Sequence, residues 1–142
     1  MMILEEVGNK ITVEDIRAIE EKIGKVTDDY KAFLLQNNGG MPTEELYLKF
    51  TEPDTENNGS EGSDLHYFFD NKEIIEWYDN LTFEDLIPSA CLPIACDSFD
   101  NVYMLNTEPG DKYGFIYFAD ADDWKCIIAA KSFTDFLSKL KN

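Results

Sequence analysis

The sequence predicts a single α+β domain, in which a mainly antiparallel sheet is flanked by helices from the N-terminal and C-terminal parts of the chain. Three observations lead to this class. Apolar residues recur at helical spacing near both ends, short apolar runs separated by turn residues fill the middle, and no repeat or linker divides the 142 residues. An alternation of strands and helices would instead have indicated a doubly wound parallel sheet. We expect one domain over residues 1–142, with a core from about 12 to 140.

The first helix is expected to follow Thr12, which can cap it together with Asp15 three residues later. Isoleucines and a valine then recur every three or four residues, while charged residues take the opposite face. Gly24 should end this helix, because glycine readily forms a C-terminal cap. A second helix is expected over 28–37, since two aspartates favour its start and an Asn-Gly-Gly sequence stops it.

The middle of the chain predicts strands joined by polar turns. Residues 51–64 hold no apolar residue except one proline, so we expect an exposed loop or local disorder there. A helix is expected over 71–80, and a last helix should begin after Ser132, which forms a capping box with Asp135. The expected strands cover 47–50, 65–69, 91–95, 102–105, 114–118 and 126–130.

The charge of the chain excludes several kinds of partner. Lysine and arginine number 12 against 29 aspartates and glutamates, which gives a formal net charge of −17. Binding to nucleic acid or to an anionic membrane depends on basic residues, so neither is expected here, and a cationic partner is favoured. No apolar run reaches the length of a membrane span, and the N-terminal residues lack the plan of a signal peptide. We therefore expect a cytoplasmic protein.

The negative charge is concentrated in the middle of the chain. Residues 51–123 carry 18 acidic and 2 basic residues, whereas residues 124–142 carry 1 acidic and 4 basic residues. Two interpretations remain open at this point. The acids keep the protein soluble, or they form a binding surface that steers a basic partner toward it.

Residues suited to catalysis or metal binding are few. Cys91, Cys96 and Cys126 have apolar neighbours, so we expect buried free thiols that serve packing. His66 is the only histidine and lies far from them in sequence, so the spacing of a zinc site is absent and no nucleophile motif marks a partner for it. The acids from Asp120 onward lack the length and the glycine of a calcium loop. We predict no catalytic residues, no metal and no cofactor.

Three blocks of residues follow one another over most of the chain. They are Thr12-Val-Glu-Asp-Ile16 through Ile23-Gly24 to Asp29-Tyr-Lys-Ala-Phe-Leu34 and Asn38-Gly-Gly40; Leu92-Pro-Ile-Ala95 with Asp97 and Val102-Tyr-Met-Leu105; and Gly114-Phe-Ile-Tyr-Phe118 with Asp120 and Ala130-Lys-Ser-Phe-Thr-Asp-Phe-Leu137. In this order and spacing, the blocks resemble the SUKH superfamily, which groups bacterial immunity proteins with the fungal Smi/Knr regulators of cell-wall synthesis.

The chain departs from the pattern of this superfamily at two turns. Val26-Thr27 stands where members usually have Leu-Pro before the second helix. Asp100-Asn101 stands where a glycine often precedes the central strand, and we expect the turn to survive because asparagine tolerates a positive φ. Both departures concern the scaffold rather than a catalytic group.

The resemblance implies a single α+β domain without enzymatic activity. Its bacterial members bind and block a cognate toxin, commonly a nuclease or a deaminase, and the fungal relative looks like a scaffold that influences wall glucan synthesis. On this basis we expect an immunity protein that neutralises a basic protein toxin, with a nuclease as the first choice. A scaffold or regulatory module with an endogenous partner is the alternative, and an acidic hydrolase is the third hypothesis.

Toxin-contacting residues differ between members of the superfamily, so local chemistry has to select the candidates here. A nuclease presents arginine and lysine to phosphates, and carboxylates at similar spacing can occupy such a site through charge-assisted hydrogen bonds. Trp124 lies beside several acids, as interface tryptophans do, although an ordinary half-buried tryptophan at a strand end is the other interpretation. The candidate partner-binding residues are Glu52, Asp54, Glu56, Glu61, Asp64, Asp97, Asp100, Asp120, Asp122, Asp123 and Trp124.

Overall fold

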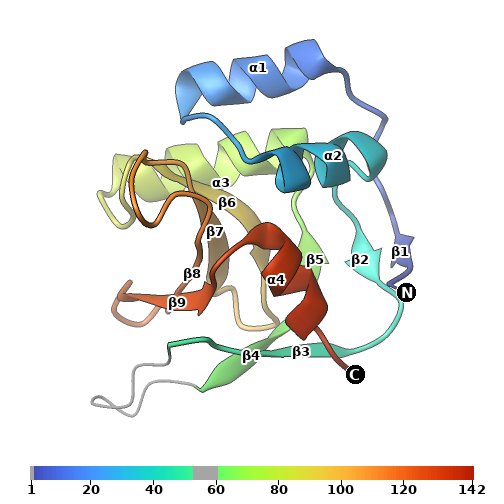
Figure 1. Ribbon diagram of the computed structural model, residues 1–142, viewed down its shortest axis with the longest axis vertical. Helices are drawn as coiled ribbons and strands as arrows, with labels where there is room; N and C mark the ends of the chain where they lie inside the picture. The colour runs from blue at the N-terminus through green and yellow to red at the C-terminus, as the bar shows by residue number, and fades with distance from the viewer. Residues whose placement is uncertain (1, 53–60) are drawn as a thin grey trace.

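A five-stranded antiparallel sheet forms the centre of the computed structural model, which describes residues 2–52 and 61–142 (Figure 1). Its strands are, in spatial order, β5 (Tyr67–Phe68), β6 (Cys91–Cys96), β7 (Val102–Asn106), β8 (Ile116–Ala119) and β9 (Cys126–Ala130). From β6 onward each strand pairs with the next one in sequence, so successive turns lie at alternate ends of the sheet. The turns around residues 97–101 and 120–125 therefore lie at the same end.

Two small antiparallel sheets extend this centre. In the first, β1 (Leu4–Glu5) pairs with β2 (Met41–Pro42), and in the second β3 (Leu46–Lys49) pairs with β4 (Gly62–Leu65). Backbone hydrogen bonds from Thr51 to Ala129, 3.0 Å, and from Glu52 to Ile128, 2.9 Å, attach the chain after β3 to β9. The β3–β4 hairpin is thus connected to the edge of the main sheet.

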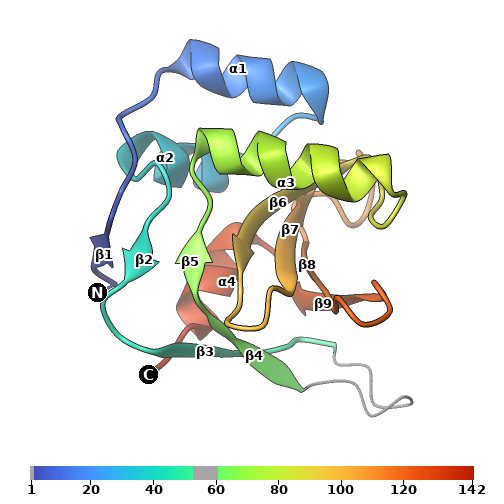
Figure 2. The same ribbon diagram turned by 180° about the vertical axis from the view of Figure 1, so that it is seen from behind.

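Four helices of the described residues cover the sheets. They are α1 (Val13–Lys22), α2 (Asp28–Gln36), α3 (Asn71–Phe83) and α4 (Phe133–Lys139). In Figures 1 and 2, α1 is outermost, beyond α2 and α3, while α4 lies lower, nearer to β3. This arrangement is the α+β domain that the sequence predicts, with helices from both ends of the chain beside a mainly antiparallel sheet.

Side-chain caps start three of these helices. Thr12 and Asp15 form the expected capping box of α1, and Asp70 with Glu73 forms a second box before α3 that the sequence analysis missed. At α4 only half of the expected box is present. The Ser132 hydroxyl accepts a hydrogen bond from the backbone N–H of Asp135, 2.9 Å, but the Asp135 carboxylate is used differently.

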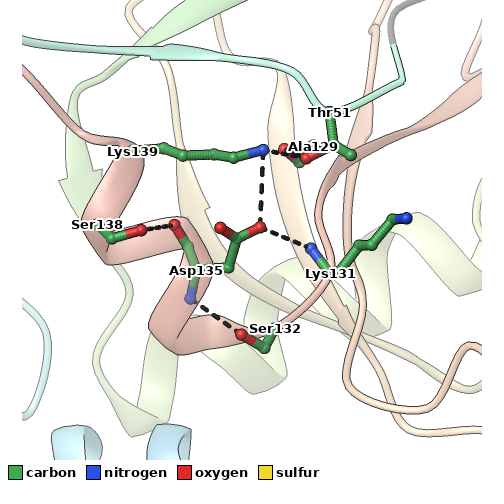
Figure 3. Close-up of polar contacts among 7 residues, drawn as sticks. All are labelled: Thr51, Ala129, Lys131, Ser132, Asp135, Ser138 and Lys139. Carbon is green, nitrogen blue, oxygen red and sulfur yellow. Dashed lines mark hydrogen bonds and ion pairs between the residues drawn. The ribbon is translucent and has the colours of Figure 1, made fainter.

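Figure 3 shows how the Asp135 carboxylate is used instead. It accepts the backbone N–H of Lys131, 3.1 Å, and lies 3.6 Å from the ammonium of Lys139. Lys139 also donates to the hydroxyl of Thr51, which itself donates to the carbonyl of Ala129, 3.2 Å. The carboxylate therefore helps to hold α4 against β9 and the chain after β3, which is a tertiary role that the capping pattern does not reveal.

The core contains a cluster of aromatic rings between α2, α4 and the sheet. Ring centroids of Tyr30 and Phe133 are 5.0 Å apart in a T-shaped contact, and Tyr103 makes a similar contact with Phe136 at 5.1 Å. All four residues are buried, and each such ring contributes on the order of 2 kcal/mol through burial. The cluster joins the first and last blocks of the chain, which lie more than 100 residues apart.

Removing the hydroxyl of Tyr30 is expected to leave the free energy of unfolding unchanged or to raise it by up to about 1 kcal/mol. This hydroxyl is buried without a hydrogen-bond partner among the described residues, so Tyr30→Phe removes a desolvated polar group and keeps the ring. Tyr103→Phe is the matched control, because the Tyr103 hydroxyl donates to the backbone oxygen of Asp64 at 2.9 Å. Urea unfolding should show a loss of about 1 kcal/mol for this control. A comparable loss for Tyr30→Phe would contradict the assignment.

Asp29 connects the starts of α2 and α4. Its carboxylate accepts the hydroxyl of Thr27, 2.5 Å, the backbone N–H of Tyr30, 2.8 Å, and both the N–H and the hydroxyl of Thr134 at 3.0 and 2.9 Å. Burial raises the pKa of the Asp29 carboxyl, but these hydrogen bonds outweigh it and leave the pKa below its ordinary value of 3.8. The charged form is therefore the one that the fold stabilises.

Asp29→Asn is expected to lower the free energy of unfolding by about 1–2 kcal/mol at pH 7. A carboxyl whose pKa is depressed in the folded state stabilises the fold above its unfolded pKa and loses this contribution as the pH falls through the folded pKa. The difference in the free energy of unfolding between wild type and variant should have its largest value above about pH 4 and become smaller below it. Urea unfolding from pH 7 down to pH 2 would measure this change. A difference that does not change with pH would contradict this role.

The structure corrects the expected strands and one expected turn. Residues 62–64 are not loop but belong to β4, and the single strand expected over 65–69 is divided between β4 and β5, which lie in different sheets. In the turn before β7, the positive φ of 62° belongs to Asp100 rather than to Asn101. Pairing of β4 with β3 and of β5 with β6 decides the two differences in the strands, because such pairing joins segments that are distant in sequence.

Candidate partner-binding surface

The turn of residues 97–101 is built around the side chain of Asp97. One carboxylate oxygen accepts the backbone N–H groups of Phe99 and Asn101 at 2.9 and 2.8 Å. The other accepts the hydroxyl of Ser63, 2.6 Å, and the side-chain amide of Asn101, 2.9 Å. Asp97 has an exposed fraction of 0%, so the expectation that it contacts a partner is wrong. Its carboxylate is an internal acceptor that fixes the turn.

Asp64 attaches the β3–β4 hairpin to the same turn. Its carboxylate accepts the backbone N–H of Ser98 at 3.1 Å and also the hydroxyl of Ser98. Asp64 and Ser63, neighbours on β4, thus each hold one side of the 97–101 turn through side-chain hydrogen bonds. The hairpin and the turn form one rigid unit although they are more than 30 residues apart in sequence.

The turn between β8 and β9 lies next to this unit. The side-chain oxygen of Asn101 accepts the backbone N–H of Ala121, 2.8 Å, which joins the two turns. Within the second turn, Asp120 accepts the N–H of Asp122, 2.9 Å, and Asp123 accepts the N–H of Lys125, 2.9 Å. Asp122 and Asp123 are exposed. Carboxylates of three segments distant in sequence therefore gather at one end of the sheet.

A hollow of about 350 Å³ lies between these segments. Asp64, Asp97 and Asp120 contribute to its lining together with three aromatic residues: Tyr47, Phe99 and Phe118. We refer to it as the acidic hollow. It brings together three of the candidate residues, and it adds aromatic rings that the sequence analysis did not select.

Phe99 is the most notable of the residues that sequence reasoning missed. It occupies the centre of the 97–101 turn with an exposed fraction of 80%, and Tyr47 on β3 is exposed to 51%. A bulky apolar side chain in a turn of polar residues is a signal that could have identified Phe99. Tyr47 could not have been identified in this way, because its alternation with buried leucines is that of any half-exposed strand.

The remaining candidates have different positions. Glu61 and Asp100 are exposed at the margins of the acidic hollow, next in sequence to residues that line it, whereas Glu52 is exposed beside β9 and does not line it. Trp124 is half-buried and packs against the core. This position agrees with the second interpretation given above, that of an ordinary half-buried tryptophan at a strand end. Asp54 and Glu56 lie outside the described residues.

Three carboxylates contribute to the lining of the acidic hollow. Two ion pairs between described residues join Lys22 to Asp79, 3.0 Å, and Lys139 to Asp135, 3.6 Å, and neither includes an acid that lines the hollow. Burial raises the pKa of Tyr103 well above its ordinary value, and the charges of Asp97 and Asp64 raise it further. The carboxylates of Asp64, Asp97 and Asp120 in its lining make the hollow acidic, as a site for a cation requires.

Lysines form a second, separate hollow. It measures about 530 Å³ and is lined in part by Lys49, Lys139 and Lys141. Tyr47 borders both hollows, so the lysine-lined hollow and the acidic hollow are neighbours. The surface therefore offers charges of both signs that a partner has to match.

The three cysteines are free, and Cys91 and Cys96 are buried as expected, whereas Cys126 is only half-buried. Burial raises the pKa of Cys91 and of Cys96 to about 12, so neither is a thiolate near neutral pH. Within residues 2–52 and 61–142, no group of three or more His, Cys, Asp or Glu side chains is arranged to hold a metal ion. The described helices include none that is long and apolar enough to cross a membrane.

A comparison with protein-family models found one family over nearly the whole chain. The model described as SMI1 / KNR4 family (SUKH-1) matches residues 10–139. A search of curated proteins found no match.

Proposed function

The chain belongs to the SMI1 / KNR4 family (SUKH-1), and from this premise we propose that it is a non-enzymatic immunity protein that binds and neutralises a cognate toxin with a basic active site, a nuclease being the first choice. One observation carries the proposal. Acids from β4, the 97–101 turn and the 120–125 turn come together at one end of the sheet, where Asp64, Asp97 and Asp120 line one hollow.

Neutralisation on this model is electrostatic and steric. The acidic end of the sheet occupies the basic residues that the toxin needs for phosphates, and carboxylates form bidentate hydrogen bonds with arginine that are strong once water is excluded. Long-range attraction between opposite charges can raise the association rate by about 10–1000-fold at low salt. Fast association suits an antidote, since it has to bind the toxin before damage accumulates.

The internal hydrogen bonds of the surface support such a role. Asp97 and Asp64 hold the hairpin and the turn together before any partner arrives, so little conformational entropy is lost on binding. The acids that fix the surface and the exposed acids, Asp122 and Asp123, have different tasks. A change at the buried Asp97 acts mainly on folding, whereas a change at Asp122, whose carboxylate accepts no hydrogen bond among the described residues, acts mainly on binding.

The alternative is a scaffold or regulatory module that binds an endogenous partner. The family description names the SMI1/KNR4 proteins, which favours this role. The same acidic surface would then serve a cationic partner of the cell that produces the protein, and neutralisation of a toxin would play no part. Neighbouring genes separate the two roles, because a toxin gene next to this one supports the first.

Co-expression with a toxin, chosen from genes that neighbour the one for this protein, tests the proposal directly. Cells that produce the toxin together with this protein are expected to survive, while cells that produce the toxin alone should lose viability by several orders of magnitude. A variant with Asp122→Lys and Asp123→Lys should protect less well at equal expression. Failure of the wild-type chain to rescue cells, with both proteins present and folded, would reject the immunity role for that pair.

A further inference from the structure

We propose that the acidic hollow binds the side chain of a single arginine of the partner. This inference rests on the proposed function for the partner and deepens it, because it names the residue type that is recognised and the place where it binds. The evidence is the combination of exposed aromatic rings with carboxylates in one hollow, together with the way in which the chain fixes both.

The lining has two kinds of group that attract a guanidinium ion. Tyr47 and Phe99 are large rings with much of their surface exposed, and a guanidinium stacks on such faces through cation–π attraction. Asp64 and Asp120 add carboxylates, which accept the forked N–H groups of arginine. A hollow of acids alone would attract any cation, whereas the rings favour a planar cation that is weakly hydrated.

The buried Asp97 adds charge and order at the base of this arrangement. Its four hydrogen bonds all come from neutral donors, so its negative charge is not cancelled by a cation. Two of these bonds come from the N–H groups of Phe99 and Asn101, so the backbone of the turn that carries the Phe99 ring is fixed. A turn that is ordered in advance costs less entropy when a ligand binds.

Tyr47 lies close to the neighbouring strand of its sheet. A Cβ atom at Gly62 on β4 would lie 2.7 Å from the Tyr47 hydroxyl oxygen and 2.9 Å from a carbon of its ring. The ring therefore lies directly over the glycine, in space that any other residue would occupy. Phe118, which lines the hollow, is fixed below by ring contacts with Phe50 at 4.7 Å and Tyr103 at 5.1 Å.

Two short peptides test the proposal without the partner. They are acetyl-Gly-Arg-Gly-amide and the same peptide with citrulline, which has the shape of arginine but no charge. In a titration followed by NMR, the arginine peptide is expected to bind with a dissociation constant on the order of millimolar. The backbone signals that shift should be those of residues 62–64, 97–101 and 118–120. The citrulline peptide should give no saturable shift.

Matched variants locate the site. Phe99→Ala should weaken binding of the arginine peptide about fivefold through loss of the cation–π contact. Phe83→Ala is the control, since Phe83 is exposed to 91% at the end of α3 and does not line the hollow. Asp120→Asn should weaken binding by a similar factor, whereas Asp111→Asn, in the turn at the opposite end of the sheet, should leave it unchanged.

Three results would overturn the proposal. They are equal binding of the citrulline peptide, shifts that never saturate or that spread over the whole acidic surface, and an equal loss of affinity in Phe99→Ala and Phe83→Ala. Each of them is independent of the co-expression experiment. Rescue of cells together with any of these results would keep the immunity role and reject the arginine site.

Discussion

Replacing Asp97 with alanine is expected to lower the free energy of unfolding by about 3 kcal/mol. The change removes the acceptor of four hydrogen bonds at a position with 0% exposure, and it leaves the hydroxyl of Ser63 and the amide of Asn101 without their partner. The two backbone N–H groups of the turn lose their acceptor as well. Urea unfolding measures this loss of stability. Amide hydrogen exchange should also show faster exchange of the backbone N–H groups in the 97–101 turn.

Asp122→Ala is the control for this experiment. Asp122 lies in the neighbouring turn, is exposed, and accepts no hydrogen bond through its carboxylate among the described residues. Its removal should change the free energy of unfolding by less than about 0.5 kcal/mol. Asp97→Asn should fall between the two, since the amide oxygen can still accept from the backbone of the turn. Equal stability of Asp97→Ala and Asp122→Ala would refute the internal role of Asp97.

Reversing the charge of Asp122 and Asp123 is expected to slow association with the cationic partner about tenfold at low salt. Both residues are exposed at the acidic end of the sheet, so lysine at these positions weakens the attraction that guides the encounter. Dissociation should change much less, because rim charges act mainly on the association rate. Stopped-flow measurements over a range of salt concentrations should also show a flatter dependence of the association rate on salt.

A variant with the same change in net charge controls for the charge of the whole molecule. Glu14→Lys with Glu21→Lys alters two exposed residues of α1, which lies outermost, beyond α2 and α3, in Figures 1 and 2. This pair should slow association only slightly. If both double variants slow it equally, net charge rather than the acidic surface governs the encounter, and the surface has no special role.

The helices and the buried thiols could be predicted from the sequence because their causes are local. The capping pair Thr12 and Asp15, and the helical spacing of the isoleucines after it, depend on residues three or four positions apart. The apolar neighbours of Cys91 and Cys96 likewise indicate burial. The strongly negative composition also predicts a cationic partner.

The strands after residue 50 could be predicted less well. Residues 62–64, Gly-Ser-Asp, have no preference for a strand, and they form β4 because they pair with 47–49 of β3. The run 65–69 is divided at His66 between β4 and β5, which lie in different sheets. The run contains neither glycine nor proline that would indicate a break at this point. Pairing between distant segments overrides local propensity at such places.

For the binding surface, sequence determined the number of acids and tertiary structure determined what each one does. Asp97 and Asp100 are three residues apart with the same side chain, yet one is buried as an internal acceptor and the other is exposed. Asp64, Asp97 and Asp120 line one hollow with Phe99 only because β4 and the turns after β6 and β8 meet at one end of the sheet. Charge is a property of single residues and can be counted along a chain. A hollow depends on the register of strands that are far apart in sequence, and only the folded chain fixes that register.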